Sequence, residues 1–191
     1  GAKPWVSDEL SAVLERVDSP RFYLDFETFS PAMPLYRGTK PYQVLPFQWS
    51  CHIDRGDGEL EHREFLASGE IDPRREFAES LITAIEDAGP VIVYSSYEKR
   101  VIKRLINDFD DLASELRLLI ERLVDLHRII LENYYHPEFH GSLSIKSVLP
   151  ALVSDLSYED LEIQDGLIAA TRFHSLVRGT LTGREADNAR T

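Results

Sequence analysis

Apolar and polar residues alternate along residues 21–28, which read Arg-Phe-Tyr-Leu-Asp-Phe-Glu-Thr. Successive side chains on a β-strand point to opposite faces, so residues two apart share a face. This pattern predicts a strand with one apolar face, formed by Phe22, Leu24 and Phe26. The opposite face then carries Tyr23 and two carboxylates, Asp25 and Glu27.

The same kind of pattern predicts further strands over residues 47–53 and 59–66, joined by a turn at 55–58 as a hairpin. Residues 91–94 form a short continuous apolar run, which is typical of a strand buried on both faces. Residues 124–126 are short, and we interpret them as a brief strand that enters the following helix.

Helical periodicity predicts a helix from residue 72 to the Gly89-Pro90 stop, with an Asp72 cap and proline at its first position. Ser7 and Ser96 are expected to cap the helices 7–17 and 97–109. The other helices are expected over residues 112–123, 126–134, 144–152 and 164–177. Residues 28–42 hold three of the ten prolines, and we expect a loop there and another at 136–141.

This order of elements predicts the α/β class: a mixed sheet of three antiparallel strands followed by parallel strands, flanked by helices. A chain of 191 residues is long enough for one domain with a sizeable core. We expect an N-terminal helix or extension over residues 1–20, the main domain over 21–178 and a polar tail over 179–191.

The composition indicates the cellular compartment of the protein. No apolar run of about 18 residues indicates a membrane-spanning helix, and the N-terminus lacks the pattern of a signal peptide. Cys51 is the only cysteine, which excludes an intramolecular disulfide and a cysteine-cluster zinc site. These features favour a cytoplasmic protein with no membrane partner.

The net charge argues against duplex nucleic acid as a partner. Lys and Arg number 21 and Asp and Glu 33, which gives a formal net charge of −12. A protein that binds duplex nucleic acid mainly by neutralising phosphates is expected to be basic. An acidic enzyme can still act on nucleic acid where metal ions supply positive charge locally.

Asp25 and Glu27 are the first candidate site residues. Two carboxylates side by side repel each other unless a cation or shared proton compensates them, and oxygen ligands suit a divalent metal. The alternative is an ordinary solvent-facing strand. Glu98 is the second candidate, in the first turn of a helix that follows a buried strand. The helix dipole alone favours an acid there, but open sheets also place their sites at that end of a strand.

Asp125 and Asp165 are further acids that the pattern singles out. Asp125 lies between apolar residues and needs a partner, with Arg122 or Arg128 available, so a structural role is favoured. Asp165 is as readily a helix cap. Four bases fall within six positions of one helix and are either a solvated face or phosphate contacts: Lys99, Arg100, Lys103 and Arg104.

The stretch Tyr23-Leu-Asp-Phe-Glu-Thr28 resembles the first motif of the DEDD superfamily of 3′–5′ exonucleases. Val93-Tyr-Ser-Ser-Tyr-Glu98 resembles the second motif, in which a strand leads into a helix that presents an acid. Four longer stretches resemble a bacterial domain family of unknown function within that superfamily: residues 29–36, 46–50, 142–150 and 158–166. The resemblance covers most of residues 20–178.

The resemblance implies an RNase H-like fold and two-metal hydrolysis of phosphodiester bonds at single-stranded DNA or RNA ends. Asp25, Glu27 and Glu98 would bind Mg²⁺ or Mn²⁺, with one ion activating water and the other stabilising the leaving oxygen. The superfamily ordinarily has Asp where this chain has Glu98. Asp125 corresponds to a position that is more often structural than catalytic.

The third motif of the superfamily, an Asp preceded by His or Tyr on a helix, has no match in residues 179–191. Asp187 lacks the apolar helical context. We expect either a domain that continues beyond residue 191, which we favour, or a degenerate site. In both cases we expect weak or absent activity from this chain. A non-catalytic module that binds nucleic acid or protein is the main alternative, and a small-molecule phosphohydrolase is a third possibility.

Overall fold

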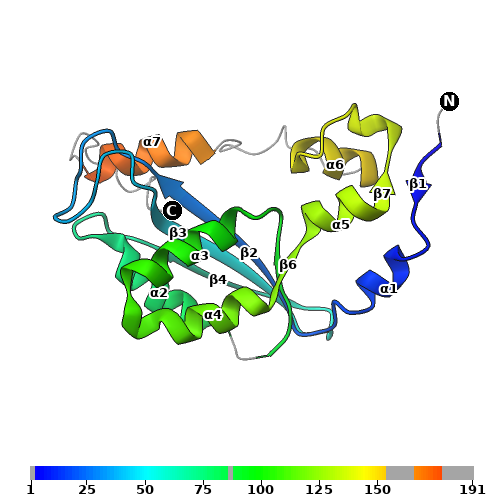
Figure 1. Cartoon of the computed structure of the whole chain (residues 1–191), viewed down its shortest axis with the longest axis horizontal. Coiled ribbons are helices and arrows are strands. Elements are labelled where there is room, and N and C mark those ends of the chain that lie inside the picture. The colour runs from blue at the N-terminus through cyan, green and yellow to red at the C-terminus, as the bar shows by residue number, and fades with distance from the viewer. Residues whose placement is uncertain (1–2, 86–87, 154–165, 178–191) are drawn as a thin grey trace.

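The computed structural model describes residues 3–85, 88–153 and 166–177 (Figure 1). Its main feature is a five-stranded sheet with the strand order β4-β3-β2-β5-β6. The strands are β2 (Arg21–Phe29), β3 (Leu45–Asp54), β4 (Leu60–Leu66), β5 (Val91–Val93) and β6 (Leu123–Asp125). The first three in chain order pair antiparallel, whereas β5 pairs parallel with both β2 and β6. The mixed α/β sheet expected from the sequence is therefore confirmed.

Three helices pack on the apolar face of the sheet: α2 (Pro73–Ala84), α3 (Tyr97–Asp108) and α4 (Ala113–Glu121) (Figure 1). Phe22, Leu24 and Phe26 are buried there, as the alternation predicts. Phe26 meets Phe77 of α2 edge to face, with 4.9 Å between the ring centroids. These helices leave the Tyr23 and Asp25 side of β2 exposed.

The remaining elements lie around the ends of the sheet (Figure 1). They are β1 (Trp5–Val6), α1 (Leu10–Leu14), α5 (Leu126–Asn133), β7 (Tyr134–Tyr135), α6 (Ile145–Leu152), α7 (Gly166–Val177) and two 3₁₀ turns, Asp110–Leu112 and Pro137–Phe139. Phe173 of α7 stacks on Phe47 with ring centroids 4.2 Å apart, so α7 packs across the ends of β2 and β3. Among the described residues, no helix is long and apolar enough to cross a membrane.

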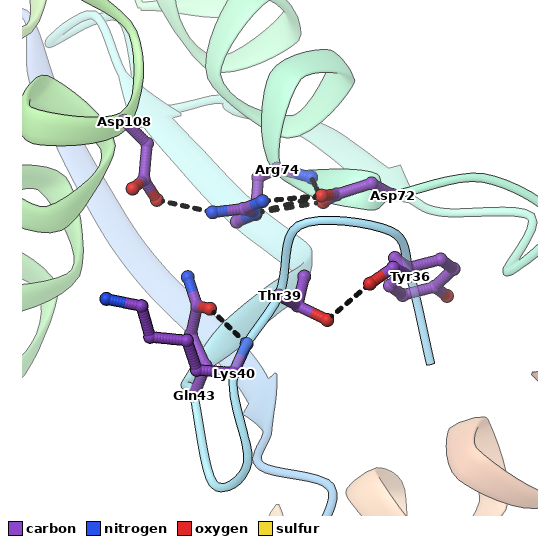
Figure 2. A network of polar contacts seen from close by, with 7 residues as sticks. All are labelled: Tyr36, Thr39, Lys40, Gln43, Asp72, Arg74 and Asp108. Carbon is purple, nitrogen blue, oxygen red and sulfur yellow. Dashed lines mark hydrogen bonds and ion pairs between the residues drawn. The ribbon is translucent and has the colours of Figure 1, made fainter. Parts of the chain in front are cut away.

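Arg74 ties α2 to α3. Its backbone N–H and guanidinium both bond Asp72, the expected cap of α2, and the guanidinium also reaches Asp108 at 2.7 Å (Figure 2). Figure 2 also shows the loop after β2, where the Thr39 hydroxyl donates to the Tyr36 carbonyl at 2.7 Å. This loop therefore contains a turn over residues 36–39.

Two capping predictions were wrong. The Ser7 hydroxyl donates to Asn133 Oδ1 at 2.7 Å, so it is engaged elsewhere and α1 begins only at Leu10. Ser96 makes no side-chain cap, because Ser95 Oγ accepts the hydrogen bond from Tyr97 N at 3.1 Å instead.

Pairing and helix boundaries also differ from the sequence predictions. The pairing of β1 with β7 was not predicted, and it joins residues more than a hundred positions apart. The predicted helix 112–123 corresponds to α4 and is shorter at both ends, because Leu112 ends a 3₁₀ turn and Leu123 begins β6. The 179–191 tail lies outside the described residues.

The packing of α2 against β2 is testable. Phe77 is fully buried, so Phe77→Ala is expected to lower the free energy of unfolding by about 3–5 kcal/mol. Ile71→Ala, an apolar truncation at a position 62% exposed, is expected to change it by less than about 0.5 kcal/mol. Urea denaturation measures both variants, and equal effects would contradict this packing.

Candidate functional site

A cleft of about 730 Å³ lies over the exposed side of β2 and the end of β5. All three acids of the two predicted motifs line it: Asp25 and Glu27 from β2, and Glu98 from α3. Lys146 of α6 lines the same cleft. The fold thus brings together two sequence motifs that lie some seventy residues apart.

The position of Asp25 follows from the two-residue period of β2. Asp25 is exposed and lies opposite Ser50 of β3, which also lines the cleft. Its pKa is raised because protein atoms around the cleft remove part of its water, an effect that a backbone hydrogen bond from Phe26 reduces. Glu27 is half-buried and comes directly before a shift in the β2–β3 register. Such bulges re-aim side chains and are common beside functional sites.

Glu98 is buried, with 5% of its surface exposed, and its Oε2 atom has no hydrogen-bond partner among the residues that the structure describes. Desolvation raises the pKa of Glu98 to about 7, and the charges of Asp25 and Asp125 add to the shift. A buried ionised carboxylate without a partner is costly. Glu98 is therefore a group that a proton or a cation would stabilise.

Contacts around the first turn of α3 hold Glu98 at the cleft. The hydroxyls of Tyr97 and Thr28 are hydrogen-bonded, which ties this turn to β2 just beyond the bulge. On the same face of the helix, one turn further on, Val101 and Ile102 are buried in the core. These contacts fix the rotation of α3, and with it the direction in which Glu98 projects.

Lys146 and Tyr94 are among the cleft residues that the sequence did not single out. The Tyr94 hydroxyl donates to the Leu143 carbonyl at 2.8 Å, which fastens the segment before α6 to the end of β5. The family resemblance included residues 142–150, and that stretch was the available signal. It carried no assigned role, because a lone Lys has no spacing that identifies it as a site residue.

Asp125 does not line the cleft. It lines a neighbouring cavity of about 420 Å³ and caps α5, where its Oδ1 accepts from the backbone N–H of Arg128 at 3.2 Å. A structural role therefore fits Asp125, although its partner is a backbone N–H rather than a guanidinium. Asp165 and Asp187 lie outside the described residues.

The four bases of the predicted phosphate contact are on the outward side of α3, and all are exposed: Lys99, Arg100, Lys103 and Arg104. Arg100 lies over the Tyr97 ring at 5.4 Å from its centroid. Lys99 also lines the 420 Å³ cavity, next to Arg128. The first turn of α3 therefore presents an acid to the cleft and a base to the neighbouring cavity.

The donor types of the cleft suit a hard divalent cation, since Asp25, Glu27 and Glu98 offer only carboxylate oxygens. The unpartnered Oε2 of Glu98 supplies one donor that lacks any other role. Across the described parts of the chain, no three His, Cys, Asp or Glu residues are grouped closely enough to hold an ion as they stand. An ion would therefore have to draw these side chains together.

Residues 22–144 match the model of the family described as "Domain of unknown function (DUF2779)". The chain is 25% identical over 193 residues to "Uncharacterized protein UU173" of Ureaplasma parvum, covering 89% of this chain and 28% of the relative. It is also 25% identical over 184 residues to "Uncharacterized protein MG366 homolog" of Mycoplasma pneumoniae, covering 86% of this chain and 28% of the relative. The chain thus spans little more than a quarter of each relative. No solved structure gives a significant match.

The burial of Glu98 predicts how stability depends on pH. Its pKa is about 7 in the folded chain against an ordinary value of 4.5, so the folded state holds the proton more tightly. The stabilisation is complete below pH 4.5 and is lost as pH rises through about 7, by up to about 3 kcal/mol. Glu98→Gln stays neutral, so we expect it to be more stable than the unsubstituted chain at pH 8.

Urea denaturation from pH 4.5 to 8 measures this difference between Glu98→Gln and the unsubstituted chain. Glu59→Gln is the control, because Glu59 is an exposed residue of the β3–β4 turn. The control is expected to follow the unsubstituted chain throughout. Identical pH profiles for all three proteins would show that Glu98 is not desolvated.

Proposed function

The chain belongs to the DUF2779 family, and we propose that its cleft is the metal site of a nuclease that hydrolyses phosphodiester bonds. The observation that carries this proposal is the buried, unpartnered Oε2 of Glu98 in a cleft that Asp25 and Glu27 also line. Carboxylates gathered at one end of a sheet are the ligands that hard cations prefer.

The resemblance to DEDD 3′–5′ exonucleases supports the same proposal of a nuclease site. Asp25 and Glu27 stand in the stretch that resembles the first motif and Glu98 in the stretch that resembles the second. Both stretches border one cleft, although they lie on different elements. The sheet, with three antiparallel strands followed by parallel ones, agrees with the RNase H-like arrangement that the resemblance implies.

In this proposal Asp25, Glu27 and Glu98 would hold Mg²⁺ or Mn²⁺, which would supply positive charge and an activated water. Glu98 would have to lose its proton to be a ligand, and with a pKa of about 7 its carboxylate form is populated near neutral pH. Lys146 contacts a substrate phosphate from the α6 side of the cleft. The Tyr97–Thr28 hydrogen bond keeps Glu98 oriented toward the two β2 acids.

The proposed substrate is a single-stranded end of DNA or RNA. A net charge of −12 opposes the binding of a duplex along the protein surface, whereas the end of a single strand needs only a few contacts near the cleft. The third motif of the superfamily has no counterpart in the described residues. We therefore propose that this chain, which spans 28% of the relatives it matches, is weakly active or inactive by itself.

Metal binding tests the proposed site. Calorimetric titration with Mn²⁺ is expected to show binding that Asp25→Asn and Glu27→Ala each remove. Loss of an outer-shell partner costs about 10–100-fold in metal affinity, and loss of a ligand is expected to cost at least as much. Glu59→Ala, which removes an acid far from the cleft, is expected to bind as the unsubstituted chain does.

An unsubstituted chain that binds no Mn²⁺ at millimolar concentration would contradict the metal site. It would favour a non-catalytic module that binds nucleic acid or protein. The described residues hold no preassembled ligand cluster, and this observation also favours such a module. That module is the second candidate function.

Activity of the chain is a separate test. With Mn²⁺ and a labelled single-stranded oligonucleotide, we expect at most slow shortening. Rapid degradation that Asp25→Asn abolishes would overturn the expected weakness of this chain while supporting its site. Turnover of free nucleotides without cleavage of the polymer would instead indicate a small-molecule phosphohydrolase.

A further inference from the structure

The outward face of α3 is basic in an otherwise acidic chain. Within the described residues, Lys99, Lys103 and Arg104 form no ion pair. The neighbouring helix α2 is different, since Arg74 and Arg75 both pair with acids at 2.6–3.0 Å. Asp108, four residues after Arg104 on α3, pairs with Arg74 of α2 instead.

This arrangement costs helix stability. Lys99 and Lys103 are four residues apart, as are Arg100 and Arg104, and like charges at that spacing destabilise a helix. Lys99 and Arg100 also lie in the first turns, where the helix dipole disfavours cations. Burial explains the opposite face of α3 but not this one, because all four bases are exposed. A bound polyanion would offset the repulsion.

The basic face begins at a cavity beside the cleft. The 420 Å³ cavity and the cleft share two lining residues, Val93 and Ser95, at the end of β5. Lys99 and Arg128 bring positive charge to the cavity, and Ser95 and Ser96 bring hydroxyls.

The two acids of this cavity are already engaged. Asp125 caps α5, and Glu132 accepts from Arg128 Nε at 2.7 Å. In the part of the chain that the structure describes, the two terminal nitrogens of Arg128 carry no hydrogen bond. Lys99 and these nitrogens are therefore available to an anion.

We propose that this cavity is a phosphate subsite and that the outward face of α3 binds the backbone of a single-stranded nucleic acid. The proposal rests on the proposed function, because it places the scissile phosphate in the adjoining cleft. Glu98 and Lys99 are consecutive residues of one helical turn, and they line the cleft and the cavity respectively. A strand that leaves the cleft past this turn meets Lys99 first and then Lys103. A free mononucleotide would reach the cleft alone, so the basic face selects a polymer.

Fluorescence anisotropy of a short labelled oligothymidylate, without added metal and over a range of salt concentrations, tests this proposal. Each phosphate contact contributes about 0.7 to the slope of log affinity against log salt for a single strand. Lys99→Ala/Lys103→Ala is therefore expected to reduce the slope by about 1.4, and Arg128→Ala by about 0.7. The matched control is Arg16→Ala/Arg117→Ala, which removes two exposed positive charges elsewhere and is expected to keep the slope.

Thermal melting checks that the variants are folded, and none of the substituted side chains is buried. Equal slopes for the Lys99/Lys103 and control variants would overturn the proposal, as would an unsubstituted chain that does not bind the oligonucleotide. Displacement of the oligonucleotide by polyglutamate at equal charge concentration would also overturn it and identify a face for acidic proteins. Because no metal is present, these outcomes are independent of Mn²⁺ titration, which tests the carboxylate site by itself.

Discussion

The alternation along β2 is the constraint on which the rest of the structure depends. β2 lies between an antiparallel and a parallel neighbour, and α2, α3 and α4 bury its apolar side chains on one face. Asp25 and Glu27 then lie on the opposite face of the sheet, because successive side chains of a strand point to opposite faces. Packing on one side of the sheet thus decides where the carboxylates lie on the other.

For Glu98, packing lowers the stability of the fold instead, because it buries an acid. Val101, Ile102 and Leu105 anchor α3 in the core, and the Tyr97–Thr28 bond anchors its first turn, so Glu98 is held at the cleft with only 5% of its surface exposed. Its desolvation raises its pKa to about 7, and the Asp25 charge adds to this effect. Sequences tend to break local rules at functional sites. An acid buried at a stability cost beside two other acids is therefore best understood through what it would bind.

Average charge conceals the arrangement of charge. A net charge of −12 argues against nucleic acid as a partner when it is treated as spread evenly over the surface. The fold separates the charges: acids line the cleft, while exposed bases cover the outward face of α3. Because Glu98 and Lys99 are adjacent in one turn, the two surfaces meet at the end of β5. A cleft lined by acids beside a basic helix face is an arrangement that composition alone would not reveal.

The periodicity of the sequence determined the sheet strands, the helices on its apolar face, the Asp72 cap and the side of β2 that carries Asp25 and Glu27. These features follow from neighbours in the chain, whose spacing sets which side chains share a face. Only the tertiary structure decided that Glu98 is buried, that Lys146 faces the same cleft and that Asp125 belongs to a separate cavity. It also diverted Ser7 from its expected cap to Asn133. Each of these outcomes depends on contacts between distant segments, and local propensity carries no information about such partners.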